Sequence, residues 1–220
     1  MALIIDVETT GLPVIGNTPF GKNPDYKQLE SYDNCRIVQI TFMLCNEKFE
    51  QIDINDSIIK SNGFTINNSD FHGITNEISQ SKGVSISEIT DLLYKYLKRV
   101  SHIVAHNADF DISVIKSELF RLDMNHIIEE IEEKNVLCTM NHTKDMVNAK
   151  NKYGNKYGVK YPSLSELYKF TMNEDITNAH NSKYDVINLH CVVKTLYDTN
   201  KLNFNEPINF TEEKEEIKPN

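Results

Sequence analysis

The chain has 220 residues, of which 40% are hydrophobic and 25% charged, a composition that excludes fibrous, disordered and integral membrane proteins. No apolar run approaches the roughly 18 residues of a membrane span, and no secretory leader is recognisable, so we expect a cytoplasmic or otherwise intracellular protein in a reducing compartment. The formal net charge of −9 argues against a broad basic face for nucleic acid, although carboxylates that bind divalent cations also count as negative in that sum.

The first half of the chain predicts three strands. Residues 2–6 form a short apolar run that ends before a turn at Gly11 and Pro13, as expected of a strand buried on both faces. The polar stretch 14–34 predicts a long loop. Residues 36–45 and 48–54 are rich in β-forming side chains and are separated by only two residues, which predicts a hairpin.

The second half predicts alternating helices and strands. The apolar spacing predicts helices at 85–100, 108–122, 163–170 and 182–197 and short strands at 103–105 and 136–138, with Ser85 and Glu88 as a capping box. Together these elements indicate an α/β domain, a mixed sheet flanked by helices, over residues 1–204. Residues 205–220 are acidic and poor in large apolar side chains, so we expect a disordered tail.

Cysteine spacing indicates no zinc site. Cys35, Cys45, Cys138 and Cys191 are scattered, and each lies in or beside an apolar run. We expect buried free thiols.

Asp6 and Glu8 lie two residues apart at the end of the first strand, where period-2 alternation places both carboxylates on one face. Like charges this close repel each other unless a cation lies between them. Taken alone, such a pair is more often a turn cap beside a solvated carboxylate.

The segment 106–111, AHNADFD with its preceding alanine, connects a predicted strand to a helix. Asn107 or Asp109 could serve as the helix cap. Asp111 lies one turn inside the helix, on the face of Val114 and Ile115, which predicts an inward carboxylate. A first-turn carboxylate favoured by the helix dipole is the competing interpretation.

Asp185 is the most informative single residue, because it shares a helical face with Leu189, Val192 and Leu196. A carboxylate on a core-facing stripe is costly without a partner or a metal. His180 lies five residues earlier, in the segment leading into that helix, where a lone histidine is more often a surface residue.

These motifs resemble those of the DEDD superfamily of 3′→5′ exonucleases, in the branch with a histidine base that includes the proofreading epsilon-subunit (DnaQ-like) and RNase T-like groups. The matching segments are DVETTGL at 6–12, HNADFD at 106–111 and HNSKYD at 180–185, with secondary matches RIVQI at 36–40, HGIT at 72–75 and LSELY at 164–168. The resemblance runs from residue 2 to about 197 and implies a ribonuclease-H-like fold.

The resemblance implies a two-metal phosphodiesterase that uses Mg²⁺, with Mn²⁺ as a substitute. By this likeness Asp6 bridges both ions, Glu8 and Asp185 complete the site of the attacking water, and Asp111 serves the second ion. His180 is then the general base, since an imidazole can accept a proton near neutral pH. The substrate contacts implied are Thr9, Thr10, Gly11, Leu12, His72, Asn107 and Phe110.

Two features depart from minimal proofreading subunits. The loop 14–34 is longer than the usual turn and could alter access of duplex ends. The segment 150–161 interleaves lysines with tyrosines, at Lys150, Lys152, Tyr153, Lys156, Tyr157, Lys160 and Tyr161. Such a pattern suits a single-stranded backbone, and equally suits a solvated loop whose tyrosines cover the core edge.

We therefore expect a DNA 3′→5′ exonuclease of proofreading or repair type that releases 5′-mononucleotides from a free, single-stranded or frayed 3′ end. A DNA polymerase is a candidate partner. The alternatives are an exoribonuclease that trims RNA 3′ ends, a catalytically silent nucleic-acid-binding domain of the same fold, and a ribonuclease-H-like endonuclease. The four carboxylates with His180 count against the silent domain, and the spacing of His180 and Asp185 disfavours the endonuclease.

Overall fold

A computed structural model describes residues 1–16, 18, 22–150 and 159–202 of the protein. The strands are β1 (Ala2–Thr9), β2 (Ile37–Cys45), β3 (Gln51–Ile58), β4 (His102–Ala105) and β5 (Asn135–Cys138). The helices are η1 (Leu29–Tyr32), α1 (Ser69–His72), α2 (Asn76–Lys82), α3 (Ile86–Leu97), α4 (Ala108–Arg121), α5 (Asn125–Glu132), α6 (Thr139–His142), α7 (Lys144–Val147), α8 (Leu164–Met172) and α9 (Ser182–Asp198). No helix in this described part is long and apolar enough to cross a bilayer.

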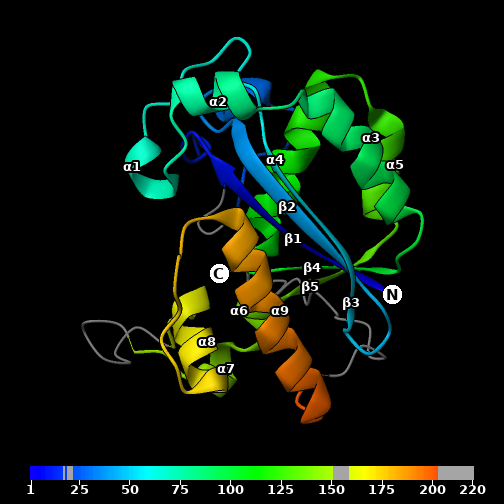
Figure 1. Ribbon diagram of the computed structural model, residues 1–220, viewed down its shortest axis with the longest axis vertical. Coiled ribbons are helices and arrows are strands. Elements are labelled where there is room, and N and C mark those ends of the chain that lie inside the picture. The colour runs from blue at the N-terminus through cyan, green and yellow to red at the C-terminus, as the bar shows by residue number, and fades with distance from the viewer. Residues whose placement is uncertain (17, 19–21, 151–158, 203–220) are drawn as a thin grey trace, which may run out of the picture.

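The five strands form one mixed sheet in the order β3-β2-β1-β4-β5. The pairs β1/β2 and β2/β3 are antiparallel, and β1/β4 and β4/β5 are parallel. Figure 1 shows α9 along one face of β1 and β2, with α3, α4 and α5 on the opposite side. The predicted α/β fold, a mixed sheet flanked by helices, is confirmed.

Alternating side chains of β1 divide the core into two layers. Leu3, Ile5 and Val7 pack into the cluster formed with α3, α4 and α5, whereas Ala2 and Ile4 pack into the cluster formed with α8 and α9. Because Asp6 and Glu8 continue the even-numbered series, they emerge on the face that α9 covers.

The hairpin is confirmed, but its second strand begins and ends later than predicted, at 51–58 rather than 48–54. The reason is the turn that precedes it. The Asn46 side chain accepts hydrogen bonds from the amides of Lys48 and Glu50, and Phe49 adopts a left-handed φ of 57°. Residues 48–50 are thereby held out of the ladder.

The predicted capping box of Ser85 with Glu88 is wrong, because the side chain of Ser85 bonds to Ser87 instead. The Ser85 hydroxyl accepts from the amide of Ser87 and lies 2.7 Å from the Ser87 hydroxyl, which competes for it. A capping box occurs instead at α8, where Ser163 accepts from the Glu166 amide and the Glu166 carboxylate accepts from the Ser163 amide.

The loop 14–34 contains the short helix η1 and is attached to α4. Asn23 donates to the Asp109 carboxylate from its side chain and its amide, and Arg121 donates to the Leu29 carbonyl and the Asp33 carboxylate. Within the loop, the Tyr32 hydroxyl donates to the Pro24 carbonyl at 2.6 Å. The helices α1, α2, α5, α6 and α7 were not predicted. Among them α5 carries a recognisable apolar stripe of Ile127, Ile128 and Ile131.

Three of the four cysteines, Cys35, Cys45 and Cys138, are buried as predicted, whereas Cys191 is half-buried. All four are free thiols. The predicted tail 205–220 lies outside the described residues, as do Lys152, Tyr153, Lys156 and Tyr157 of the basic and aromatic segment. The tail and the role of that segment therefore stay predictions.

Candidate functional site

The site is centred on the carboxyl end of β1. Asp6 and Glu8 lie opposite Thr41 and Gln39 of β2, and the register shifts between Glu8 and Thr9. Such a bulge increases the local twist and ends regular pairing at a defined point. Both carboxylates are therefore placed at the position where β1 leaves the sheet.

Asp185 reaches this point from α9. Val186, Leu189 and Val193 of that helix pack into the cluster that contains Ile4 and Met43. This packing turns the first-turn carboxylate of Asp185 toward the sheet. Carboxylate oxygens of Asp6, Glu8 and Asp185 all lie within 4.8 Å of one another. Three of the predicted ligands are thus brought together by two elements that are far apart in the sequence.

Asp111 belongs to α4 in the other helical layer and lies outside this group of three. Strand β4 pairs with β1 only up to Ile4, so the β4-side edge of β1 is uncovered beyond that residue. Asp111 fills the position and accepts a hydrogen bond from the Val7 amide at 3.2 Å. Only 2% of Asp111 is exposed, which confirms the inward orientation predicted for it.

The electrostatics of the four carboxylates oppose their ionisation. Burial raises the pKa of Asp6 well above its usual range, and the charges of Asp111, Asp185 and Glu8 raise it further. Burial, with the charge of Asp185, raises the pKa of Glu8 to about 7. Burial likewise raises the pKa of Asp111 to about 8 and that of Asp185 to about 6. The four carboxylates therefore repel one another, and a cation is the natural partner.

His180 lies beside the group rather than within it. Its amide donates to the Asp185 carboxylate at 3.0 Å, and its backbone has a left-handed φ of 66°, an uncommon conformation for a residue with a side chain. The imidazole is exposed and meets the ring of Phe71 edge to face at 6.5 Å between centroids. An exposed imidazole next to the carboxylates can exchange protons with solvent.

The segment 9–12 leaves β1 as a tight, internally bonded turn. The Thr9 hydroxyl donates to the Gly11 carbonyl at 2.7 Å, and the Thr10 hydroxyl donates to the Asn34 carbonyl at 2.9 Å. A Cβ atom on Gly11 would lie 2.9 Å from the Asn34 carbonyl oxygen, so this position requires glycine. Leu12 follows with 75% of its surface exposed.

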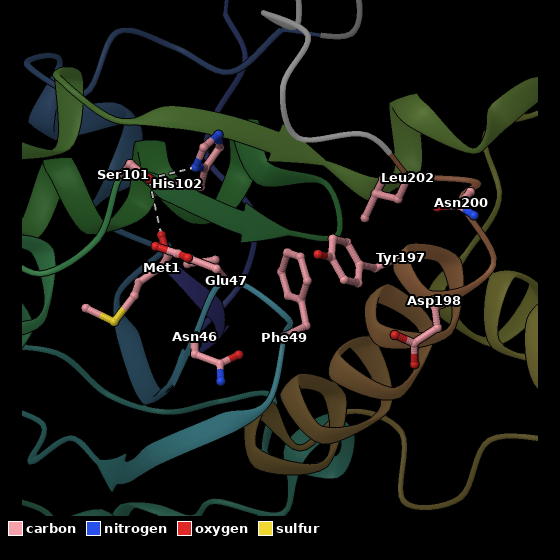
Figure 2. Close-up of a pocket in the computed structure, with 11 residues that line it drawn as sticks. Met1, Asn46, Glu47, Phe49, Ser101, His102, Tyr197, Asp198, Asn200 and Leu202 are labelled. Atoms are coloured by element: carbon pink, nitrogen blue, oxygen red, sulfur yellow. Dashed lines mark hydrogen bonds between the residues drawn. The ribbon is translucent and has the colours of Figure 1, made fainter.

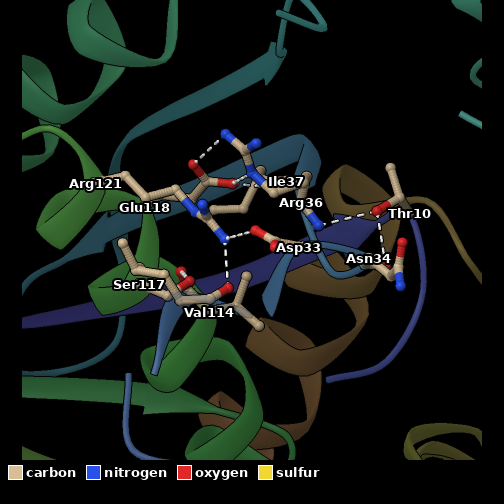
Figure 3. A network of polar contacts seen from close by, with 10 residues as sticks. Thr10, Asp33, Asn34, Arg36, Ile37, Val114, Ser117, Glu118 and Arg121 are labelled. Atoms are coloured by element: carbon tan, nitrogen blue, oxygen red, sulfur yellow. Dashed lines mark hydrogen bonds and ion pairs between the residues drawn. The ribbon is translucent and has the colours of Figure 1, made fainter. Parts of the chain in front are cut away.

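An ion pair that was not predicted secures this turn to the core, as Figure 3 shows. Arg36 donates to both carboxylate oxygens of Glu118, at 2.6 and 2.9 Å, and its amide donates to the Thr10 hydroxyl. Glu118 is buried on α4 and also accepts from the Ile37 amide. Its position on the inward face of α4 was the available signal, because a buried glutamate requires a cation.

The remaining predicted substrate contacts lie in different environments. His72 is buried and its ring nitrogens bond the Ile74 amide and the Asn68 side chain, which itself donates to the Thr9 carbonyl. Asn107 is exposed at the start of α4, and Phe110 is half-buried against the core. His72 therefore supports the shape of α1, and Phe71 beside it is 70% exposed.

His106, first in its motif, has a structural role. Its two ring nitrogens lie 3.0 Å from the Thr139 hydroxyl and 3.0 Å from the Pro162 carbonyl. Burial lowers the pKa of His106 to about 4. This neutral ring joins the end of β4 to α6 and to the segment that precedes α8.

Two described residues of the basic and aromatic segment 150–161 make contacts with other side chains. Lys160 pairs with Glu166, and the Tyr161 ring lies 4.2 Å below the Lys144 ammonium group.

The residues present fit divalent cations. Four carboxylates are hard oxygen donors of the kind that Mg²⁺ and Mn²⁺ prefer. Two buried acceptors near them, Gln39 Oε1 and Asn181 Oδ1, have no hydrogen-bond partner within the described ranges of the chain. The hydration shell of a bound cation supplies donors for such acceptors.

A wide hollow of about 860 Å³ lies at the opposite end of β1 and is drawn in Figure 2. Met1, Phe49, His102 and Tyr197 are among its lining residues. Its acids, Glu47 and Asp198, are both exposed, and Asp198 pairs with Lys194. The described residues around it therefore hold no group of buried like charges comparable to that at the carboxyl end.

The sequence was compared with models of known protein families and with curated proteins. A family model described as an exonuclease, RNase T, matches residues 3–192. Among curated protein sequences, none matches the chain.

Solved structures share the fold. Exonuclease X in complex with 5′-overhanging duplex DNA is 20% identical, with a TM-score of 0.58, and the match covers 92% of this chain and 95% of that one. Exonuclease I of E. coli in complex with a dT13 oligonucleotide is 16% identical, with a TM-score of 0.66, covering 89% of this chain and 40% of that one. Exonuclease I of Methylocaldum szegediense is 16% identical with a TM-score of 0.65, covering 91% and 41%. The chain thus spans about two fifths of the exonuclease I structures.

Proposed function

The chain belongs to the RNase T exonuclease family of the DEDD superfamily, and on that premise we propose that it is a two-metal 3′→5′ exonuclease acting on DNA. The observation that carries the proposal is the convergence of Asp6, Glu8 and Asp185 within 4.8 Å, with buried Asp111 beside them. Four negative charges in so small a volume match two divalent cations rather than one.

Asp6, Glu8, Asp111 and Asp185 would hold the ions. Two Mg²⁺ ions, when bound, supply positive charge for the attacking and leaving oxygens of the phosphodiester. Asp6 is central among the four carboxylates, because the charges of the other three all act on it. Asp111 approaches from α4, whereas Asp6, Glu8 and Asp185 lie on the α9 side.

His180 is assigned as the general base. It removes a proton from the attacking water, whose oxygen forms the new bond to phosphorus while the bond to the 3′-oxygen breaks. The leaving 3′-oxygen takes up a proton and a 5′-mononucleotide is released. The exposure of the His180 ring lets it pass its proton to solvent between turnovers.

The segment 9–12 is assigned to the terminal nucleotide. Its turn is rigid because Thr9 and Thr10 are both hydrogen-bonded and the Arg36–Glu118 pair braces it. Leu12, which follows this turn, and Phe71, which lies against His180, are exposed and offer apolar surface to an unpaired base. A free or frayed 3′ end satisfies this arrangement, whereas a paired end must first open.

DNA is preferred to RNA as the substrate on the basis of what the similar folds bind. Exonuclease X and exonuclease I were captured with DNA. A proofreading or repair role, with a DNA polymerase as partner, remains the functional context that we propose. An RNA 3′-end trimming activity is the alternative outcome of the same experiment.

The test is incubation of the purified protein and Mg²⁺ or Mn²⁺ with 3′- and 5′-labelled DNA and RNA, single- and double-stranded. We expect stepwise loss of 5′-mononucleotides from single-stranded DNA 3′ ends and no reaction at a 3′-terminal phosphate. Faster cleavage of RNA would assign the exoribonuclease function. Nicking of a circular substrate would contradict exonuclease action.

A further inference from the structure

A row of polar residues crosses the sheet behind the carboxylates. Asp6 of β1 pairs in register with Thr41 of β2, and Thr41 pairs with Asp56 of β3. Residues directly opposite on neighbouring strands project from the same face. Thr41 and Asp56 therefore lie on the α9 side of the sheet, one and two strands away from the site.

These residues form a continuous set of hydrogen bonds with α9. Asp56 Oδ1 accepts from Gln39 Nε2 at 2.7 Å and from Thr41 Oγ1 at 3.1 Å. Thr41 Oγ1 lies 2.7 Å from Ser182 Oγ. An ionised carboxylate only accepts, so the single hydroxyl proton of Thr41 goes to Asp56, and Ser182 must donate to Thr41. We refer to Ser182, Thr41, Asp56 and Gln39 as the polar chain.

The polar chain is buried where it meets the helix. Thr41 and Ser182 are fully buried and Gln39 is 3% exposed, so water cannot readily replace a broken bond. Ser182 is the first residue of α9, three residues before Asp185 and two after His180. Any displacement of Ser182 is consequently transmitted to both residues.

The apolar contacts of α9 cannot set its position alone. Val186, Leu189 and Val193 hold the helix against the sheet, but hydrophobic contact is not directional and tolerates small sliding. A metal pair requires ligands placed to within about 0.5 Å. The directional bonds of the polar chain meet this requirement at the first turn of the helix.

We propose that Asp56 is a positioning residue of the candidate site: through Thr41 and Ser182 it fixes the first turn of α9, and so holds Asp185 against Asp6 and Glu8. The proposal rests on the proposed function for its kinetic consequences, but not for its consequences on metal binding. Asp56 touches neither substrate nor metal. Its effect is carried entirely by the polar chain.

A matched control lies on the same strand. Asp53 is also an exposed acid of β3, but it lies in the opposite phase of the alternation and accepts a hydrogen bond from Tyr96 of α3. Replacing Asp53 by alanine removes an acceptor and a charge from the same strand without touching the polar chain. If weakening β3 were the cause of any loss, the Asp53 and Asp56 variants would therefore lose Mn²⁺ affinity equally.

The experiment compares Thr41→Val, Asp56→Ala and Ser182→Ala with Thr41→Ser and Asp53→Ala. Mn²⁺ affinity is measured by calorimetry, kcat and KM on a 3′-labelled single-stranded DNA oligonucleotide, and Tm by thermal melting. We expect the first three variants to lose Mn²⁺ affinity and kcat by about 10-fold, the lower end for groups that orient metal ligands. KM should stay within about 2-fold, since substrate contacts are unchanged.

Two further outcomes distinguish a positioning role from a general effect on stability. Thr41→Ser keeps the hydroxyl and should keep wild-type Mn²⁺ affinity. The double variant Thr41→Val with Ser182→Ala should lose no more Mn²⁺ affinity than either single variant, because both substitutions break the same polar chain. Should Asp56→Ala fail to fold, the comparison of Thr41→Val with Thr41→Ser still tests the proposal.

Wild-type Mn²⁺ affinity in Thr41→Val and Asp56→Ala would overturn the proposal, as would an equal loss in Asp53→Ala. If the wild-type protein binds Mn²⁺ but cleaves no nucleic acid, the proposed function fails. In that case the Mn²⁺ affinities of the variants still test the positioning role of Asp56 independently of cleavage.

Discussion

The two ends of β1 differ in what they expose to a ligand. At the amino end, a hollow of about 860 Å³ is walled by residues such as His102 and Tyr197, and its acids are exposed. At the carboxyl end, three carboxylates lie within 4.8 Å of one another and a fourth is 2% exposed. The volume of the hollow alone would identify the amino end as the functional site. The buried like charges identify the carboxyl end instead, because such charges are costly to bury without a bound partner.

The difference follows from the topology. Strands β1 and β4 are parallel and end at the same edge, where β1 bulges and α4 begins. Ligands in open α/β sheets bind outside the carboxyl ends of parallel strands for this reason. Among the described residues, the amino end of β1 is surrounded by the start of β4, the turn between β2 and β3, and the last turn of α9. Substitutions matched between the two ends test whether this contrast is functional.

The largest effect is expected for Asp6→Asn. Loss of the carboxylate that faces all three others should lower turnover by at least about 10³-fold, or about 4 kcal/mol, while the fold is retained. Glu47→Gln makes the same change at the amino end and should leave turnover unaltered. Single-turnover cleavage of a 3′-labelled oligonucleotide in Mg²⁺ measures both. Near-wild-type turnover in Asp6→Asn would contradict the metal assignment.

His180→Ala should have the next largest effect. Loss of one acid–base group lowers turnover by roughly 10²–10⁴-fold, and Mn²⁺ affinity should change little because the ring is outside the carboxylate group. The residual rate should rise with pH as hydroxide replaces the base. His102→Ala is the histidine control at the amino end. A loss of Mn²⁺ affinity in His180→Ala would identify a ligand or a support instead of a base.

The metal-free protein should become less stable as the pH rises. The pKa of Glu8 is raised to about 7 and that of Asp111 to about 8, so between about pH 4 and 8 the folded state binds more protons than the unfolded state. The stabilisation is therefore complete below about pH 4 and is lost as the pH passes the raised pKa values. Thermal melting in EDTA should show Tm falling from pH 5 to pH 8.

Added Mn²⁺ should restore Tm, more at pH 8 than at pH 5, because the cation replaces the protons. Asp111→Asn keeps the acceptor for the Val7 amide and removes the charge, so it should raise the metal-free Tm at pH 8 by a few degrees, about 2–4 °C per kcal/mol. Glu47→Gln should not change this pH dependence. A metal-free Tm that rises toward pH 8 would contradict the electrostatic account.

The smallest effect is expected for Leu12→Ala. Leu12 is 75% exposed, so its truncation should not alter Tm, but KM should rise about 3- to 10-fold if the side chain packs on the terminal base. Ile52→Ala on the edge strand β3, with 48% exposure, is the apolar control. An unchanged KM for Leu12→Ala would remove this residue from the substrate contacts.

Most of the sheet could be predicted because its strands are apolar runs closed by turn residues. The predicted hairpin and the strands at 103–105 and 136–138 are confirmed, as are the helices that became α3, α4, α8 and α9. The error at β3 arose from Asn46, whose side-chain bonds extend the turn beyond the two residues that separate the strands. The short helices α1, α6 and α7 carry no period long enough to recognise.

The shared face of Asp6 and Glu8 and the core-facing position of Asp185 were determined by the sequence alone, since alternation in a strand and the apolar stripe of a helix are local properties of the chain. The tertiary structure decided what the sequence could not. Asp111 meets Val7 because β4 ends early, and the polar chain joins Asp56 to α9 because strand register brings Asp6, Thr41 and Asp56 into one row. Register and helix docking depend on contacts between distant segments, and no local pattern in the chain encodes such distances.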